Sequence, residues 1–244
     1  MDLSDKDIAR LSALASAMKL NVSKAQPSEM PTDITVCMTM FDSIETFALA
    51  LRSVRRGSQS LPVSLIVCDN GSSDGCQMWA REIATKVQTP VGMSDSVTLS
   101  YWKARFPRGI KAIQVPQYDG LPARFPREYY NIRECFRKMW PLVKTPYILM
   151  LDADVELPKG ALRTMYDMLN ADAEIGQAGV LYEEAADHVK HGCSLIRTEL
   201  AMQVLAKLTI NSCMCRQICT QLDELGFRSV YVPSISARHS RDEL

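Results

Sequence analysis

A run of apolar residues that ends in two acids constrains this chain more than any other feature. The run, Tyr147–Leu151, has strand-forming character; Asp152 follows it directly, and Asp154 lies two residues further on. Side chains two apart on an extended segment point the same way, so both carboxylates can address one object just past the strand's end. Ligands bind at that edge of open α/β sheets, and paired hard oxygens suit a divalent cation. The alternative is a strand end whose acids are merely solvated, because short acidic turns are common.

The length and composition are those of one globular domain. A chain of 244 residues fits one large α/β domain, or one domain with small appendages. With 47% hydrophobic and 23% charged residues, a well-filled core is expected and global disorder is not. Eight cysteines do not make a dense disulfide framework at this length. No apolar run approaches the length of a membrane span, and we expect a cytoplasmic protein.

Strand and helix patterns alternate along the chain. The predicted strands are 34–39, 63–68, 112–115, 147–152, 178–182 and 229–232. The predicted helices are 44–54, a segment through about 87, 128–142, 159–169, 198–208 and 214–225. This alternation predicts a mostly parallel sheet covered on both faces. We expect a helix and linker over residues 1–31 and a single α/β domain over residues 32–244.

Four motifs, in this order, resemble the GT-A nucleotide-sugar glycosyltransferases, especially the family-2-like group. They are Ile34–Phe41, Ile66–Gly75, Tyr147–Val155, and Gly226–Pro233 followed by His239. The resemblance implies a GT-A (Rossmann-like) α/β/α sandwich with a mostly parallel central sheet. It also implies a metal-dependent glycosyltransferase. Such an enzyme moves a sugar from a nucleotide-diphosphate sugar, with UDP the expected nucleotide, to an acceptor hydroxyl.

The resemblance implies where the nucleotide base would bind. It places the base against Thr39, Met40, Phe41 and Asp69. A carboxylate can accept the imide proton of uracil, and an aromatic ring offers a stacking face. Two alternatives remain open at these positions. Asp69, in an Asp-Asn-Gly sequence, can form a turn with its own backbone, and Phe41 can pack in the core.

Metal and donor ligands follow from the same resemblance. Asp154 would be the direct metal ligand, Asp152 would bridge towards ribose or metal, and His239 would complete the shell. Mixed oxygen and nitrogen donors favour Mn²⁺, with Mg²⁺ as the alternative. The ion would offset the charge that builds on the departing diphosphate. Asn131 and Arg133 would face the donor sugar or phosphate, unless they belong to an ordinary solvated helix face.

The chain departs from the family pattern at the general base. Inverting members carry an acidic pair before the helix that ends in the glycine–aromatic turn, and one acid acts on the acceptor hydroxyl. The aligned positions, near Met214 and Cys215, hold no acid. The base therefore sits elsewhere, or the enzyme retains configuration and needs none, or catalysis has been lost. Candidates for the base by location alone are Glu183, Glu184, Asp187, His188 and His191.

The three cysteines of Cys213–Cys219 could suggest a metal site. Their spacing lacks a second pair of ligands, so we interpret them as buried helical thiols.

The segment from Lys103 to Lys144 is positively charged, since it contains ten basic residues and three acidic ones. Aromatic residues are interleaved with them, as on surfaces that bind nucleic acids, so the acceptor could be a modified base in DNA. The alternative is that these charges serve only the donor diphosphate.

Two rival functions are open. A nucleotidyltransferase has a similar α/β sandwich and also uses a metal ion. Such enzymes normally have a glycine-rich phosphate loop after the first strand, and this chain has none there. A catalytically silent sugar-nucleotide-binding module is favoured by the missing acidic pair.

Overall fold

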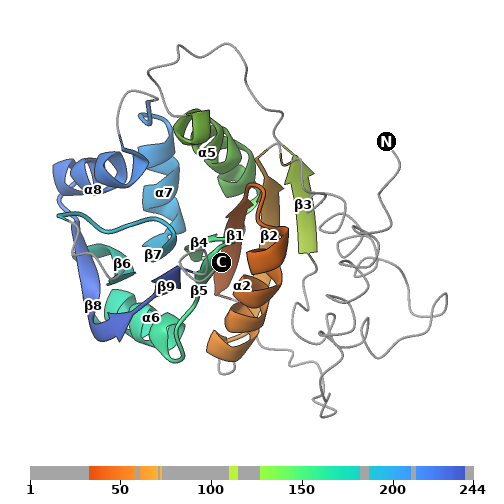
Figure 1. Cartoon of the computed structure of the whole chain (residues 1–244). Coiled ribbons are helices and arrows are strands. Elements are labelled where there is room, and N and C mark those ends of the chain that lie inside the picture. The colour runs from red at the N-terminus through yellow and green to blue at the C-terminus, as the bar shows by residue number, and fades with distance from the viewer. Residues whose placement is uncertain are drawn as a thin grey trace, which may run out of the picture.

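A seven-stranded sheet forms the centre of the molecule (Figure 1). The computed structural model describes residues 33–58, 61–70, 72, 110–114, 127–181, 187–209 and 213–239. The strands of the sheet are β1 (Ile34–Met40), β2 (Val63–Asp69), β3 (Ile110–Gln114), β4 (Tyr147–Asp152), β6 (Ile175–Leu181), β7 (Cys193–Arg197) and β8 (Arg228–Ser236). Their order in space is β3-β2-β1-β4-β7-β6-β8, so β1 and β4 lie near the middle.

The sheet is mostly parallel, which confirms the predicted α/β class. β1 runs parallel to β2 and β4, β2 parallel to β3, and β6 parallel to β8. Among the described strands of this sheet, only β7 is reversed, since it is antiparallel to both β4 and β6. The sequence did not predict β7. It has five residues and passes directly into α7 (Thr198–Leu205), with no polar turn to mark its end.

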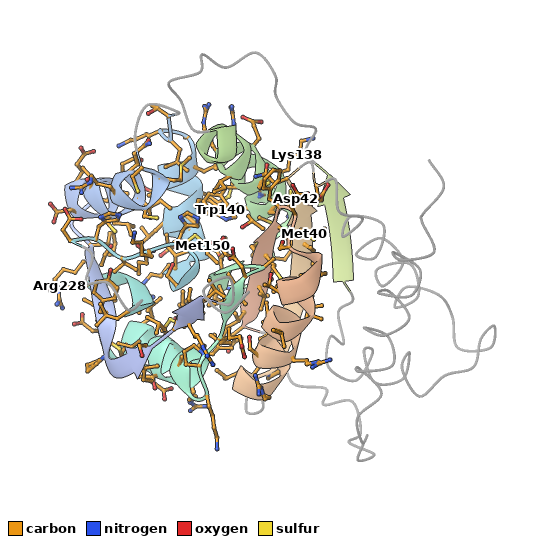
Figure 2. The ribbon with its side chains drawn as sticks, viewed as in Figure 1. Met40, Asp42, Lys138, Trp140, Met150 and Arg228 are labelled. Atoms are coloured by element: carbon orange, nitrogen blue, oxygen red, sulfur yellow. The ribbon has the colours of Figure 1, made fainter. Side chains whose placement is uncertain are left out.

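Helices cover both faces of the sheet. On one face, α2 (Ile44–Gly57) and α6 (Ala161–Ala171) share one hydrophobic core with alternate residues of β1 such as Val36 and Met38. On the other, α5 (Arg127–Met139), α7 and α8 (Met214–Glu224) enclose a second core that includes Trp140 and Met150 (Figure 2). Burial on both faces explains why the strands read as continuous apolar runs.

A short 3₁₀ turn changes the predicted end of one helix. α5 ends at Met139, and a 3₁₀ turn, η1 (Trp140–Leu142), replaces the expected end of that helix. Pro141 has no N–H for an α-helical hydrogen bond, which accounts for the change. The Trp140 ring stacks on Phe136 at a centroid distance of 4.7 Å and anchors the turn in the core.

A separate two-stranded sheet joins β5 (Val155–Glu156) to β9 (Arg238–His239), which are antiparallel. Neither strand was predicted. The expected helices near the amino terminus and through residue 87 lie outside the described residues. None of the helices that the structure describes has the length and apolar character to cross a membrane.

Candidate functional site

The paired acids lie at the carboxyl end of β4, at the middle of the sheet. Asp152 is the last residue of β4, and Asp154 lies in the turn before β5. Both side chains are partly exposed, whereas their neighbours Ala153 and Val155 are buried at 2% and 0% exposure. The alternation that the sequence predicted is therefore present, and this turn presents its carboxylates to the surface.

The Asp152 carboxylate is oriented by its neighbours on both sides. On one side, the Thr39 hydroxyl donates a 2.7 Å hydrogen bond to Oδ1, and Thr39 is the register partner of Asp152 on β1. On the other, Oδ2 lies 3.7 Å from Nε2 of His191. The backbone N–H of Asp152 donates to the Gly192 carbonyl at 3.0 Å. A carboxylate fixed in this way is preorganised for a ligand, since little rotamer freedom remains to be lost.

His191 is a buried histidine beside the paired acids, 8% exposed. Its Nδ1 lies 2.8 Å from Cys215 Sγ, and its ring packs edge-on against Phe136. Its Nε2 makes no hydrogen bond to any described residue and faces Asp152. From the sequence, His191 was a candidate only because of its location after a predicted strand. Its contact with Asp152 depends on β7 lying beside β4, and β7 was not predicted.

The pairing of β5 with β9 brings His239 to this region. The backbone of His239 is the register partner of Val155, the residue after Asp154. The Ala237 N–H donates to the Leu181 carbonyl at 2.7 Å and ties the segment before β9 to the end of β6. The three positions predicted to hold a metal thus lie at one place in the fold, although His239 is 85 residues beyond Asp154.

A tight turn follows β2, next to the end of β1. Asp69 is buried, and its Oδ1 accepts a 3.1 Å hydrogen bond from the Ser72 N–H. The Ser72 hydroxyl in turn accepts from the N–H of Asp42, whose φ of 41° is left-handed. The turn-forming role considered for Asp69 is therefore observed. Its contact with a nucleotide base stays a prediction.

The other residues predicted to bind the nucleotide sugar differ in burial, and the structure does not describe all of their side chains. Met40 packs in the core at the end of β1, and Phe41 follows it, partly exposed (Figure 2 labels Met40 and Asp42). Arg133 is half-buried on α5. The side chain of Asn131, on the same helix, is outside what the structure describes.

Three of the candidate general bases, Asp187, His188 and His191, can be placed. Asp187 is exposed and bonded to His188 and Arg216; the hydrogen bond from His188 lowers the pKa of the Asp187 carboxyl. His191 lies beside Asp152. Glu183 and Glu184 fall outside the described residues.

Comparison with known proteins identifies the fold. No protein-family model and no curated protein sequence matches this chain. Solved structures do match it. A mannosyltransferase from Pyrobaculum calidifontis, in complex with GDP-Man and Mn²⁺, has a TM-score of 0.61 and 12% identity over 95% of this chain. Glucosyl-3-phosphoglycerate synthase from Mycobacterium tuberculosis, in complex with Mn²⁺ and UDP-glucose, has a TM-score of 0.53 and 12% identity over 98% of this chain and 76% of its own.

A third similar structure is TarS 1–349 from S. aureus, with a TM-score of 0.54 and 11% identity over 84% of this chain. The chain spans 66% of the mannosyltransferase and 59% of this TarS structure. At these identities the similarity establishes a shared fold.

Proposed function

We propose that this chain, which has the GT-A fold, is a glycosyltransferase that moves a sugar from a nucleotide-diphosphate sugar to an acceptor hydroxyl. The observation that carries the proposal is the Asp152–Asp154 pair. It lies at the edge of the sheet where ligands bind in open α/β folds, with Asp152 oriented by Thr39. Two of the similar proteins are described as complexes of Mn²⁺ with a nucleotide sugar, which supports the same donor class here. UDP is the nucleotide we expect.

The residues at this edge fit a divalent cation. Asp152 and Asp154 supply hard carboxylate oxygens and are partly exposed, and His239, opposite Val155, would supply a nitrogen. This donor set suits Mn²⁺, with Mg²⁺ as the alternative. When bound, the ion offsets the negative charge that develops on the leaving diphosphate.

The protein's own side chains would position the reactants. Thr39 holds Asp152 in one rotamer, and we assign His191 a positioning role on the opposite side of that carboxylate. His191 is less suited to be the general base, because its Nε2 is buried and faces Asp152 and not an open acceptor site. Arg133 and Asn131 on α5 are proposed to meet the donor sugar or phosphate.

The nucleotide base is proposed to lie beyond the ends of β1 and β2, near Phe41 and Asp69. Phe41 is partly exposed and offers a ring face there. The fixed turn between Asp69 and Ser72 gives the base a rigid edge to bind against.

Duplex DNA is the acceptor class to test first. The described part of the basic 103–144 segment contributes three exposed cations at and beyond the end of α5, namely Arg137, Lys138 and Lys144. Binding through them should weaken steeply with salt, since each phosphate contact releases counterions. Binding that is absent at low salt, or independent of salt, would remove DNA as the acceptor and leave the donor proposal in place.

Turnover of the donor separates the proposal from its rivals. The purified chain is incubated with UDP- and GDP-sugars, with and without Mn²⁺, and the products are resolved by chromatography. A glycosyltransferase slowly releases the nucleoside diphosphate and the free sugar when water replaces the acceptor. In a parallel incubation with a nucleoside triphosphate and a sugar 1-phosphate, a nucleotidyltransferase would instead form the nucleotide sugar and release pyrophosphate. A silent module would bind the donor and leave it intact with every acceptor supplied, and that result would overturn the proposal.

A further inference from the structure

A second group of metal-ligand side chains lies behind His191. It comprises His188, Cys213 and Cys215, which we call the thiol cluster, and their ligand atoms all lie within 4.8 Å of one another. His188 lies in the segment before β7. Cys213 is the cap residue of α8, and Cys215 lies in its first turn. The fold therefore brings together two segments that are 25 residues apart in the chain.

The spacing of the cluster is close to that of a tetrahedral zinc site. Zinc binds sulfur at about 2.3 Å and nitrogen at about 2.0–2.1 Å, which puts neighbouring ligand atoms about 3.5–3.8 Å apart. Cys213 Sγ lies 3.4 Å from His188 Nε2. The remaining separations need side-chain movements of about 1 Å at most to close on an ion. Cys213 is half-buried and Cys215 is buried, which shields their sulfurs from solvent.

The side chains around the cluster already hold His188 in the orientation that a metal requires. Asp187 Oδ1 lies 2.5 Å from His188 Nδ1, so the imidazole turns its Nε2 towards Cys213. Arg216 holds the other oxygen of Asp187 at 2.7 Å. Metal-bound histidines usually donate their second ring N–H to a carboxylate in this way. The Tyr231 hydroxyl also donates to the His188 carbonyl, which fixes the backbone of the same residue.

Cys215 is surrounded by donors that stabilise a thiolate. The backbone N–H of His191 donates to its Sγ at 3.4 Å, and the His191 ring nitrogen lies 2.8 Å away. The hydrogen bond from Cys213 lowers the pKa of Cys215, and the same bond raises the pKa of Cys213 to about 12.

We propose that His188, Cys213 and Cys215 bind a zinc ion, at a site separate from Asp152 and Asp154. Two thiolates and one imidazole select zinc over Mg²⁺ or Mn²⁺, which prefer oxygen ligands. Each cysteine releases its thiol proton to solvent on binding, and a water molecule fills the fourth position. The ion ties the segment before β7 to α8. Because Cys215 contacts His191 and His191 faces Asp152, the ion also steadies one side of the acidic site.

From the sequence, the three cysteines of Cys213–Cys219 were interpreted as buried thiols. The proposal changes that interpretation for Cys213 and Cys215. The spacing of the cysteines did not reveal a histidine ligand, because His188 lies 25 residues before Cys213 in the chain. Cys219 is not in the cluster; it lies near Gln177 Oε1 and the Val189 carbonyl. It therefore provides a matched control on the same helix.

Metal content and cobalt spectroscopy of the full chain test the site. The protein purified without chelator is expected to carry about one zinc per chain. Replacement by Co²⁺ should produce a thiolate-to-cobalt charge-transfer band and the visible bands of a tetrahedral site. Cys215→Ser and Cys213→Ser should each lower the charge-transfer intensity by about half or more, because one of two thiolates is removed, and the double variant should abolish it; Cys219→Ser and Asp154→Ala should keep it in full. Asp187→Ala should weaken zinc binding about 10- to 100-fold by freeing the imidazole.

Zinc content and cobalt spectra of the wild-type chain test the zinc site even if a cysteine variant folds poorly. A wild-type chain that binds neither zinc nor cobalt through thiolate overturns the proposal. So does a charge-transfer band that keeps its full intensity in Cys215→Ser while the circular dichroism spectrum stays native. The test does not depend on sugar transfer, so failure of the glycosyltransferase proposal leaves it unaffected.

Discussion

Thr39 on β1 donates a 2.7 Å hydrogen bond to Asp152 on β4, its register partner across the sheet. Because the carboxylate is charged when it binds a cation, this contact is of the stronger, charge-assisted kind. Thr39→Val keeps the β-branched shape and removes the donor. We expect donor affinity in the presence of Mn²⁺ to fall about tenfold, or about 1.4 kcal/mol, measured by isothermal titration calorimetry.

Thr35→Val is the matched control for Thr39→Val. Thr35 lies on the same strand and shares 2.8 Å hydrogen bonds with Ser64 and Thr145, away from the paired acids. Its replacement should reduce the free energy of unfolding by about 1 kcal/mol and leave donor affinity unchanged. Equal losses of donor affinity in the two variants would show that Thr39 has no specific role.

His239→Ala tests whether β9 contributes to metal binding. The backbone of His239 lies opposite Val155, so removal of its imidazole should take one nitrogen donor from the proposed site. We expect the affinity for Mn²⁺ to fall about tenfold and the preference for Mn²⁺ over Mg²⁺ to narrow. Arg238→Ala, in the same short strand, should retain both. An unchanged Mn²⁺ affinity in His239→Ala would exclude the imidazole as a ligand.

A hydrogen bond between Tyr166 and Asp33, the residue before β1, should make the stability of the protein depend on pH. Its hydroxyl donates a 2.6 Å hydrogen bond to Asp33, which raises the pKa of Tyr166. The unfolded tyrosine loses its proton near pH 10, before the folded one does. The stabilisation is therefore complete below about pH 10 and is lost as the pH rises through the higher folded value.

Tyr166→Phe measures this contribution. Urea unfolding at pH 8 should show the variant about 1 kcal/mol less stable than the wild type, a modest value because the side chain is partly exposed. At pH 11 the difference should shrink. If the difference in free energy of unfolding is the same at pH 8 and pH 11, the Tyr166–Asp33 hydrogen bond does not cause the pH dependence.

The parts of the fold that were predictable are those encoded locally. Tyr147–Asp152 is buried on both faces, so its apolar run and its terminal acids identify a central strand without knowledge of its neighbours. The end of α5 was misplaced by three residues even though Pro141 stood in the predicted helix.

The parts that were missed depend on partners distant in the chain. β5 and β9 have two residues each and exist only because Val155 meets His239. His191 acquires its place beside Asp152 from the antiparallel entry of β7. The thiol cluster likewise requires α8 to pack near residue 188. No local period in the sequence carries such information.

The most direct measurement is the thermal shift produced by a UDP-sugar with Mn²⁺ in the wild type and in Asp154→Ala. Ligand binding raises the melting temperature with the logarithm of the ligand excess over its dissociation constant. Asp167→Ala is the control, because Asp167 is an exposed acid on α6 that pairs with Arg163. We predict a metal-dependent shift in the wild type and in Asp167→Ala, and none in Asp154→Ala. A full shift in Asp154→Ala would contradict the assignment of the cation and the nucleotide sugar to the paired acids.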